Sequence, residues 1–260
     1  MNRPHEGRAA LITGGAGKIG NATARLLAEG GCDIALLDKA SDRLDEVCAN
    51  IEADFGVRAI KLNQNLLEPD CFPSIAKELD SQFGKLDYLV NNAAFYDEMP
   101  GWGVPFAEEG YDAWLAVLRV NLLAPFFLVQ ALAPMLKKSG NGSIVNVSSI
   151  YAVVGPDMGI YAGTEMTNEA AYAASKGGLI TLTKWLSTVL APDVRVNTVT
   201  PGGVARGQDP TFVERYHAKT PLGRMATESD VASAIENFLS ARSSYVTGQN
   251  LLVDGGWTAW

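Results

Sequence analysis

A tyrosine and a lysine stand four residues apart, at Tyr172 and Lys176, and a long, mostly apolar run follows them. Residues at this spacing lie on one face of a helix, so the sequence predicts a helix that carries a phenol beside an ammonium. A free phenol titrates at about pH 10, and a neighbouring positive charge lowers that pKa because it favours the phenolate. The pair therefore predicts a general acid/base. Tyrosine and lysine also occur at this spacing on many surface helices, so the rest of the chain must supply the context.

A glycine-rich turn at residues 13–20 joins a short apolar strand to an apolar-periodic helix near the N-terminus. Gly15, Gly17 and Gly20 fit the pattern G-x-G-x-x-G. Glycines let the backbone approach a pyrophosphate closely, and the free N–H groups at the start of the helix favour an anion. The turn predicts a dinucleotide site, and the alternative is a glycine-rich turn without a ligand.

An aspartate, Asp38, ends the second apolar strand and lies 18 residues beyond Gly20 (38 − 20). A carboxylate in this place accepts hydrogen bonds from both hydroxyls of an adenosine ribose and repels a 2′-phosphate. The sequence therefore favours NAD over NADP, although Lys18 and Lys39 soften the repulsion. The alternative is an ordinary capping aspartate.

Short apolar runs alternate with helical patterns along the whole chain, which is typical of a parallel sheet covered on both faces. We predict an α/β fold: a single Rossmann-type, doubly wound domain over residues 1–260, with about seven parallel strands, helices on both faces and a substrate loop at about 203–226. The expected strands are 8–13, 33–37, 57–62, 86–90, 143–147, 194–199 and 250–253. The expected helices are 21–30, 41–55, 70–83, 111–137, one through Tyr172 and Lys176 to 190, 212–217 and 228–239, with a loop at 95–110. Pro125 and Pro134 predict kinks or a break in the long helix.

The composition excludes several classes of partner. The 260 residues are 47% hydrophobic and carry a formal net charge of −8, which argues against binding to nucleic acid. Three cysteines, Cys32, Cys48 and Cys71, show neither metal-ligand spacing nor a disulfide pattern, so we expect a reduced, cytoplasmic protein without a metal. The N-terminus does not resemble a signal peptide, and we expect no apolar run to be long enough to span a membrane.

Several short motifs follow one another along the chain. They are the glycine turn at 13–20, Asn91-Asn92-Ala93-Ala94, Asn121, Ser149, Tyr172 with Lys176, Pro201-Gly202, Thr247-Gly248-Gln249 and Asp254-Gly255-Gly256. Each motif is weak alone, but the ordered set resembles the short-chain dehydrogenase/reductase family, in its compact branch. The likeness covers nearly the whole chain.

The resemblance implies a catalytic group of Asn121, Ser149, Tyr172 and Lys176. It implies that Tyr172 exchanges a proton with the substrate oxygen during hydride transfer, and that Ser149 hydrogen-bonds the same oxygen. It further implies that Lys176 binds the nicotinamide ribose and that Asn121 holds a water in a proton relay. Ser149 matches the family better than Ser148. Tyr161 is not the catalytic tyrosine because Glu165 stands where a lysine is required, so we expect Tyr161 to line the pocket or to pack locally.

The resemblance also implies a set of cofactor contacts along the carboxyl ends of the strands. These are Gly14, Gly15, Gly17, Lys18, Ile19, Gly20, Asp38, Asn65, Leu66, Asn91, Ala93, Tyr172, Lys176, Pro201, Gly202 and Val204. Asn65 departs from the aspartate usual in the family, but an amide can still pair with the adenine amino group.

Three further positions depart from the family pattern. Lys18 stands at the middle glycine of the turn, and Gly17 is one residue early, as in the longer, sugar-nucleotide branch. Arg206 replaces a usual threonine. Ser149 and Tyr172 are 23 residues apart (172 − 149), more than is usual, which places an insertion within 154–171, at the mouth of the active site.

The polar insertion favours a hydroxylated small-molecule substrate, such as a sugar or polyol derivative, and the chain bears a weaker likeness to a subgroup of surface-sugar and flagellin-glycan biosynthesis. Three alternatives stay open: a 3-oxoacyl thioester reductase, a catalytically silent dinucleotide-binding protein, and a dehydratase or epimerase. By resemblance we also expect a homotetramer, with Trp257 and Trp260 suited to an interface.

Overall fold

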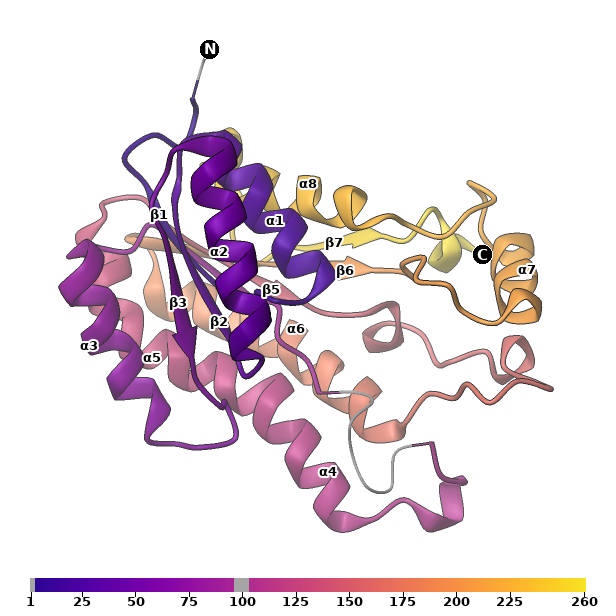
Figure 1. Cartoon of the computed structure of the whole chain (residues 1–260). Helices are drawn as coiled ribbons and strands as arrows, with labels where there is room; N and C mark the ends of the chain where they lie inside the picture. Colours follow the sequence, from indigo (N-terminus) through magenta and orange to yellow (C-terminus); the bar gives the residue numbers. More distant parts are fainter. Residues whose placement is uncertain (1–2, 96–102) are drawn as a thin grey trace.

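The computed structural model describes residues 3–95 and 103–260, so part of the loop expected at 95–110 lies outside the described residues. Seven strands form one parallel sheet in the order β3-β2-β1-β4-β5-β6-β7 (Figure 1). The strands are β1 (Ala9–Thr13), β2 (Asp33–Asp38), β3 (Ala59–Asn63), β4 (Tyr88–Asn91), β5 (Gly142–Val147), β6 (Val194–Pro201) and β7 (Asn250–Val253). This sheet confirms the predicted doubly wound α/β fold.

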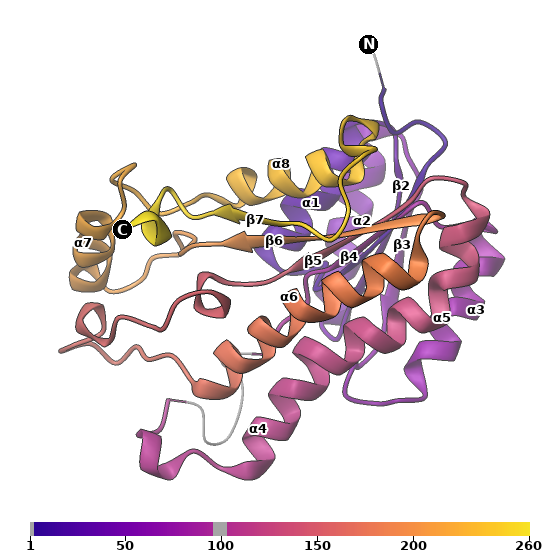
Figure 2. The ribbon, with the colours of Figure 1, turned by 180° about the vertical axis from the view of Figure 1, so that it is seen from behind.

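Helices cover both faces of the sheet (Figures 1 and 2). They are α1 (Lys18–Glu29), α2 (Ser41–Phe55), α3 (Cys71–Phe83), α4 (Tyr111–Leu118), α5 (Ala124–Lys138), α6 (Ala170–Leu190), α7 (Pro210–Lys219) and α8 (Glu228–Leu239). One apolar core joins α1, α2 and α8 to one face, and a second joins α3, α5 and α6 to the other. Because both faces are covered, every residue of β1, β4 and β5 is buried, as the continuous apolar runs predict.

The strand order reverses beside β1, and this reversal positions the site. β1 pairs with β2 on one side and with β4 on the other, so the connections after β1 and β4 diverge to opposite faces. A crevice at the carboxyl ends of strands is the usual ligand site in such sheets. Thr13, Asp38, Asn91, Val147 and Pro201 are the last residues of five strands and therefore lie along this edge.

The first helix begins earlier than expected. The prediction placed its start at residue 21, after the glycine turn, but α1 begins at Lys18 with Gly17 as its N-cap. The second half of the glycine-rich segment is thus the first helical turn of α1. The free N–H groups at the start of the helix therefore lie within the glycine-rich segment itself. By contrast, α8 and β7 have the expected bounds.

The long helix after the loop changes its hydrogen-bond pattern instead of breaking. Residues Arg119–Leu123 form a π-helical segment between α4 and α5, in which the N–H of Ala124 donates to the carbonyl of Arg119. Pro125 has no N–H to donate to the carbonyl four residues earlier, at Asn121, which favours a local departure from the α pattern. Helix α5 runs on through Pro134, so the expected break is absent from this described stretch.

The same run, Tyr111–Lys138, is long and apolar enough to cross a membrane by length and composition, with a mean hydropathy of 1.8. The expectation that no run reaches this length is therefore wrong. A helix that covers a sheet passes the same test, and this run packs against α3 and α6. Only 39% of its most apolar window is buried within the chain, however.

Candidate active site

Two adjoining cavities lie at the carboxyl edge of the sheet. A groove of about 870 Å³ follows the ends of the first strands, and a pocket of about 420 Å³ continues from it towards α7. The residues that line both cavities are Ser149, Met166, Tyr172, Gly202 and Gln208. The predicted serine and tyrosine therefore lie at the junction of the groove and the pocket.

The predicted tyrosine and lysine lie on α6, one turn apart. Lys176 is 2% exposed, and its Nζ donates a hydrogen bond of 2.8 Å to the carbonyl of Val147. The same Nζ lies 5.7 Å from the centre of the Tyr172 ring. Burial lowers the pKa of Lys176 to about 8 because the charged form loses hydration. The structure thus holds a buried ammonium beside a phenol that faces both cavities.

The two neighbouring serines have different surroundings. Ser148 Oγ donates to the carbonyl of Lys176 at 2.9 Å, so its hydroxyl fastens α6 to the end of β5. Ser149 lines both cavities, and its Oγ accepts a hydrogen bond of 3.3 Å from the N–H of Tyr151. The hydroxyl of Ser149 keeps its own proton for a ligand, which agrees with its choice over Ser148.

Asn121 lies in the π-helical segment, beneath the groove and not in its wall. Its Oδ1 accepts from the N–H of Phe95 at 2.7 Å, and its Nδ2 donates to the Phe95 carbonyl at 3.3 Å. Nδ2 also donates to Ser175 Oγ, which in turn donates to the carbonyl of Tyr172. Asn121 therefore joins the groove wall at Phe95 to the helical turn that carries Tyr172. The water relay to Lys176 stays a prediction.

The glycine turn is closed by contacts that no larger residue would allow. Gly14 has a φ of +66°, and the side-chain amide of Asn92 donates to its carbonyl at 3.3 Å. A Cβ on Gly20 would lie 2.2 Å from the same carbonyl oxygen, and one on Gly15 would lie 2.8 Å from Leu36 Cβ. Gly15 and Gly20 thus pack beneath the turn. Of the cofactor contacts predicted in this turn, those that line the groove are Gly14, Gly17, Lys18 and Ile19.

Asp38 both caps this turn and lines the groove. Its carboxylate accepts from the N–H groups of Ala16 at 3.1 Å, Lys39 at 2.8 Å and Ala40 at 3.3 Å. A carboxylate has about four acceptor sites, so this capping leaves capacity for a ligand hydroxyl. Asp38 can therefore cap the turn and also bind a ribose hydroxyl, so the two interpretations of this aspartate are compatible. Cationic side chains lie close by, since Lys39 and Arg43 line the same groove.

The other predicted cofactor contacts divide into two groups. Those that line the groove are Asn65, Leu66, Ala93, Tyr172, Lys176, Pro201, Gly202 and Val204. Asn91 does not line it: it is 3% exposed, and its Nδ2 donates to Asn146 Oδ1 at 2.8 Å. Asn146 then donates to Thr183, so Asn91 belongs to a buried polar network between the sheet and α6. The structure therefore does not place the Asn91 side chain at the predicted ribose contact.

Several lining residues were not singled out from the sequence. In the groove they include Arg43, Gln64 and Val120, and in the pocket they include Tyr151, Asn168, Phe212, Tyr216 and Met225. Val120 precedes Asn121 directly, and Tyr151 follows Ser149 by two residues, so proximity to a motif was a usable signal for both. Gln64 likewise precedes Asn65, and Asn168 lies within the predicted insertion. Phe212, Tyr216 and Met225 lie within the predicted substrate loop, so of these residues only Arg43 comes from a segment without such a signal.

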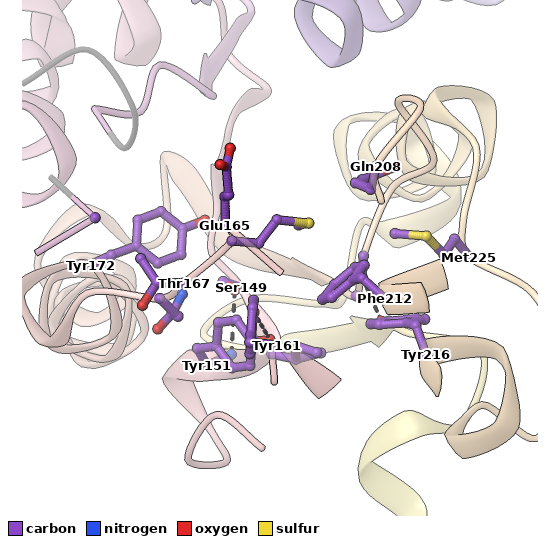
Figure 3. Close-up of a pocket in the computed structure, with 16 residues that line it drawn as sticks. Ser149, Tyr151, Tyr161, Glu165, Thr167, Tyr172, Gln208, Phe212, Tyr216 and Met225 are labelled. Atoms are coloured by element: carbon purple, nitrogen blue, oxygen red, sulfur yellow. Dashed lines mark hydrogen bonds between the residues drawn. The ribbon is translucent and has the colours of Figure 1, made fainter. Parts of the chain in front are cut away.

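The insertion forms one wall of the pocket, and α7 forms the other (Figure 3). Figure 3 shows Phe212, Tyr216 and Met225 on the side opposite Tyr172. Arg215 of α7 donates to the carbonyl of Ala162 at 2.5 Å, and Lys219 of α7 forms an ion pair with Asp157. The insertion and α7 are therefore fastened together.

A third apolar cluster lies between the insertion and α7, separate from the two cores of the sheet. Its buried members are Ile150, Ile160, Tyr161, Phe212, Tyr216, Met225 and Trp257. Trp257 stacks on Tyr216 with ring centres 4.3 Å apart and is 8% exposed. The expectation that Trp257 suits an interface is thus wrong for the single chain, which buries it internally, whereas Trp260 is 78% exposed.

Comparisons with known proteins agree with this geometry. The family model described as enoyl-(acyl carrier protein) reductase matches residues 14–258. A 3-oxoacyl-(acyl-carrier-protein) reductase of Thermotoga maritima is 35% identical over 256 residues, with 96% of this chain and 98% of the relative covered. An NAD⁺-bound xylitol dehydrogenase superposes with a TM-score of 0.87 at 29% identity, covering 97% of this chain and 99% of that one. An NADPH-dependent 3-quinuclidinone reductase of Rhodotorula rubra gives 0.88 at 27% identity, covering 100% and 94%.

The chain belongs to the short-chain dehydrogenase/reductase family. It is an oxidoreductase of the class that interconverts an alcohol and a ketone, with a nucleotide-binding Rossmann fold. The alternative of a catalytically silent binding protein gains no support from these comparisons. Relatives of the family differ in their nicotinamide cofactor, one being NAD⁺-bound and another NADPH-dependent.

Proposed function

We propose that the protein is an NAD-dependent dehydrogenase that interconverts a secondary alcohol and its ketone on a sugar or polyol derivative. One observation carries the proposal: Ser149 and Tyr172 line both the groove and the pocket. When a substrate oxygen lies between these two hydroxyls, the carbon bonded to that oxygen faces the groove. This is the arrangement that direct transfer between a substrate and a dinucleotide requires.

The residues of the groove fit a dinucleotide. The N–H groups at the start of α1 and the open turn at Gly14 and Gly17 suit a pyrophosphate, and Asp38 suits the adenosine ribose. We propose NAD and not NADP because the Asp38 carboxylate would repel a 2′-phosphate, although Lys39 and Arg43 line the same groove. A nicotinamide dinucleotide bound in this groove supplies the hydride acceptor or donor.

The side chains of the chain itself manage the proton and the position of the substrate. Tyr172 accepts the hydroxyl proton of the substrate in oxidation and donates it in reduction. Ser149 donates a hydrogen bond to the same oxygen and holds it in line. The ammonium of Lys176 stabilises the phenolate of Tyr172 by its charge. Asn121 keeps Phe95 and the turn of Tyr172 in register through the hydrogen bonds described above, and we propose that it also holds the relay water.

A second candidate is a 3-oxoacyl thioester reductase, which the name of the Thermotoga maritima relative favours. An acyl carrier protein is an acidic partner and needs a basic surface to dock. The net charge of −8 disfavours such docking, so this candidate is second. A dehydratase or epimerase returns its cofactor to the starting redox state, and external dinucleotide consumption separates it from both dehydrogenase readings.

The test is a substrate panel with absorbance of the reduced nicotinamide as the readout. Sugars, polyols and cyclic alcohols are offered with NAD⁺ and NADP⁺, and 3-oxoacyl thioesters are offered with NADH and NADPH. Oxidation of polyols with NAD⁺ supports the proposal. Turnover confined to 3-oxoacyl thioesters transfers the assignment to the second candidate, and absence of turnover with the whole panel contradicts both.

We also propose that the chain acts as one domain, with residues 203–226 as the substrate loop, in a cytoplasmic homotetramer. Exposed apolar side chains on the outer faces of the long helices support self-association. They are Leu123 at 46%, Phe127 at 40%, Trp185 at 53% and Val189 at 52% exposure. Leu251 and Leu252 on the edge strand β7 are also exposed. Sedimentation velocity of the wild type and of a Phe127→Glu, Trp185→Glu variant tests this proposal, since a monomeric wild type contradicts it.

A further inference from the structure

The smaller pocket is built for an uncharged ligand. No lysine, arginine or histidine stands among the described residues that line it. Its walls are mainly apolar and aromatic, from Ile150, Met166, Phe212 and Met225. Glu165 lies at the rim, where it is exposed and repels an approaching anion. A phosphate or carboxylate would thus lose its hydration in the pocket without gaining a cationic partner.

Two phenols form a polar site in these walls. The hydroxyl groups of Tyr151 and Tyr161 are hydrogen-bonded to each other (Figure 3). One phenol donates in this bond, so the other keeps a proton that no other group among the described residues accepts. Burial raises the pKa of both phenols, which therefore remain protonated through the neutral range. Both tyrosines line the pocket, so the pair offers one free O–H donor to a ligand.

A second polar group in the pocket has no hydrogen-bond partner among the described residues. The side-chain oxygen Oδ1 of Asn168 is buried and accepts no hydrogen bond from the described residues. Asn168 lines the same pocket and, like Tyr161, comes from the inserted segment. An alcohol hydroxyl both donates and accepts, so hydroxyl groups satisfy the phenol pair and the amide without bringing any charge into the pocket.

We propose that the pocket selects an uncharged alcohol with a second hydroxyl group, which the Tyr151–Tyr161 pair binds while Ser149 and Tyr172 engage the reacting oxygen. The volume of about 420 Å³ suits a six-membered ring or a short chain. This inference rests on the proposed function, whose site it shares. It makes the inserted segment the determinant of specificity, since that segment supplies both Tyr161 and Asn168.

The wild-type enzyme tests the inference without any substitution. We compare kcat/KM for cyclohexanol, the 1,2-, 1,3- and 1,4-cyclohexanediols and 4-hydroxycyclohexanecarboxylate, with NAD⁺ and with NADP⁺. One good hydrogen bond changes kcat/KM by about tenfold, so we expect at least one diol to exceed cyclohexanol by that factor. We expect the carboxylate to be poorer than cyclohexanol. Equal turnover of cyclohexanol and every diol, or a preference for the carboxylate, overturns the inference and leaves the proposed function standing. Absence of turnover with every alcohol contradicts both.

A double variant, Tyr151→Phe with Tyr161→Phe, tests the pair itself. We expect the ratio of kcat/KM for the best diol to that for cyclohexanol to fall about tenfold, because only the diol loses a bond. Tyr88→Phe is the control, because the Tyr88 hydroxyl is also a buried phenol but lies outside the pocket, where it is hydrogen-bonded to His5 Nδ1 at 3.2 Å. This control should change both substrates by the same factor. An unchanged ratio in the double variant overturns the inference. Thermal unfolding checks that each variant folds, and the single variant Tyr161→Phe replaces the double variant if it does not.

Discussion

The ammonium of Lys176 donates a hydrogen bond of 2.8 Å to the carbonyl of Val147, the last residue of β5. This bond joins the second turn of helix α6, which carries Tyr172, to the carboxyl edge of the sheet. Ser148, the next residue after Val147, returns a second bond to the carbonyl of Lys176. The position of the ammonium beneath Tyr172 is thus fixed from both its side chain and its backbone.

Replacement of Tyr172 by phenylalanine removes the proposed proton acceptor and keeps the ring. We expect Tyr172→Phe to lower kcat by about 10²-fold to 10⁴-fold or more, because general acid/base catalysis contributes on that scale. Binding of the dinucleotide, measured by calorimetry, should stay close to that of the wild type. Tyr245→Phe serves as the control, since Tyr245 is fully exposed on the surface. Retained turnover in Tyr172→Phe would falsify the assignment.

The lowered pKa of Lys176 predicts how stability depends on pH in the cofactor-free enzyme. Below pH 8 the lysine is protonated in the folded and unfolded chains, so the full cost of burying the charge is present. Between a folded pKa of about 8 and an unfolded pKa of about 10.4, only the unfolded chain holds the proton, so stability rises with pH. The full rise amounts to roughly 3 kcal/mol, because a tenfold difference between the two acid dissociation constants corresponds to about 1.4 kcal/mol.

Lys176→Met should lack this rise. We expect Lys176→Met to be more stable than the wild type at pH 7. The difference between their free energies of unfolding, measured in urea, should be smaller at pH 10. The control is Lys184→Met, also on α6, where the lysine is exposed. Parallel stability curves for the wild type and Lys176→Met between pH 7 and pH 10 would contradict the lowered pKa of the buried lysine.

The two serines provide a matched pair of variants. Ser149→Ala removes the proposed donor to the substrate oxygen and should lower kcat by about 10²-fold to 10³-fold with little change in stability. Ser148→Ala removes the bond to the Lys176 carbonyl and should lower the free energy of unfolding by about 1 kcal/mol, with a much smaller loss of kcat. Steady-state kinetics and urea unfolding of both variants give the comparison. The reverse pattern would exchange the roles of the two serines.

Asp38→Ala should relax the selection against NADP. The ratio of kcat/KM for NADP⁺ to that for NAD⁺ should rise by about tenfold or more, because repulsion of the 2′-phosphate is lost. Loss of the bond to Ala16 should also lower stability, which unfolding measurements record separately. Asp42→Ala, on the first turn of α2, is the control for a neighbouring carboxylate. An unchanged cofactor preference in Asp38→Ala would count against the ribose role.

The sheet and its helices were predictable because their signals are local. Apolar runs of strand length gave all seven strands, and α8 has its expected bounds because Thr227 and Asp230 form a capping box before an amphipathic run. The start of α1 was missed because glycine is permissive, and a glycine turn does not show by itself where the helix takes over.

The direction of a side chain was harder to predict than the strand or helix that carries it. Asn91 is the last residue of β4 and so lies at the edge of the sheet where the groove is. Its side chain nevertheless points towards Asn146, which lies 55 residues later on the neighbouring strand. Ser148 and Ser149 point to different surroundings although they are adjacent. Tyr151 and Tyr161 come together because the chain after Ser149 folds back on itself through two short helical turns. No periodic pattern in the sequence predicts this fold.

The third apolar cluster shares none of its buried residues with the two cores that hold the sheet together. Its members come from the helical turn after Ser149, the insertion, α7, the loop that follows α7 and the C-terminal turn. Residues in this cluster can therefore vary together while the sheet and the dinucleotide groove keep their packing. We therefore expect the substrate half of the molecule to be replaceable as a module, and a graft of residues 150–171 together with α7 is the smallest unit expected to transfer its specificity to a relative.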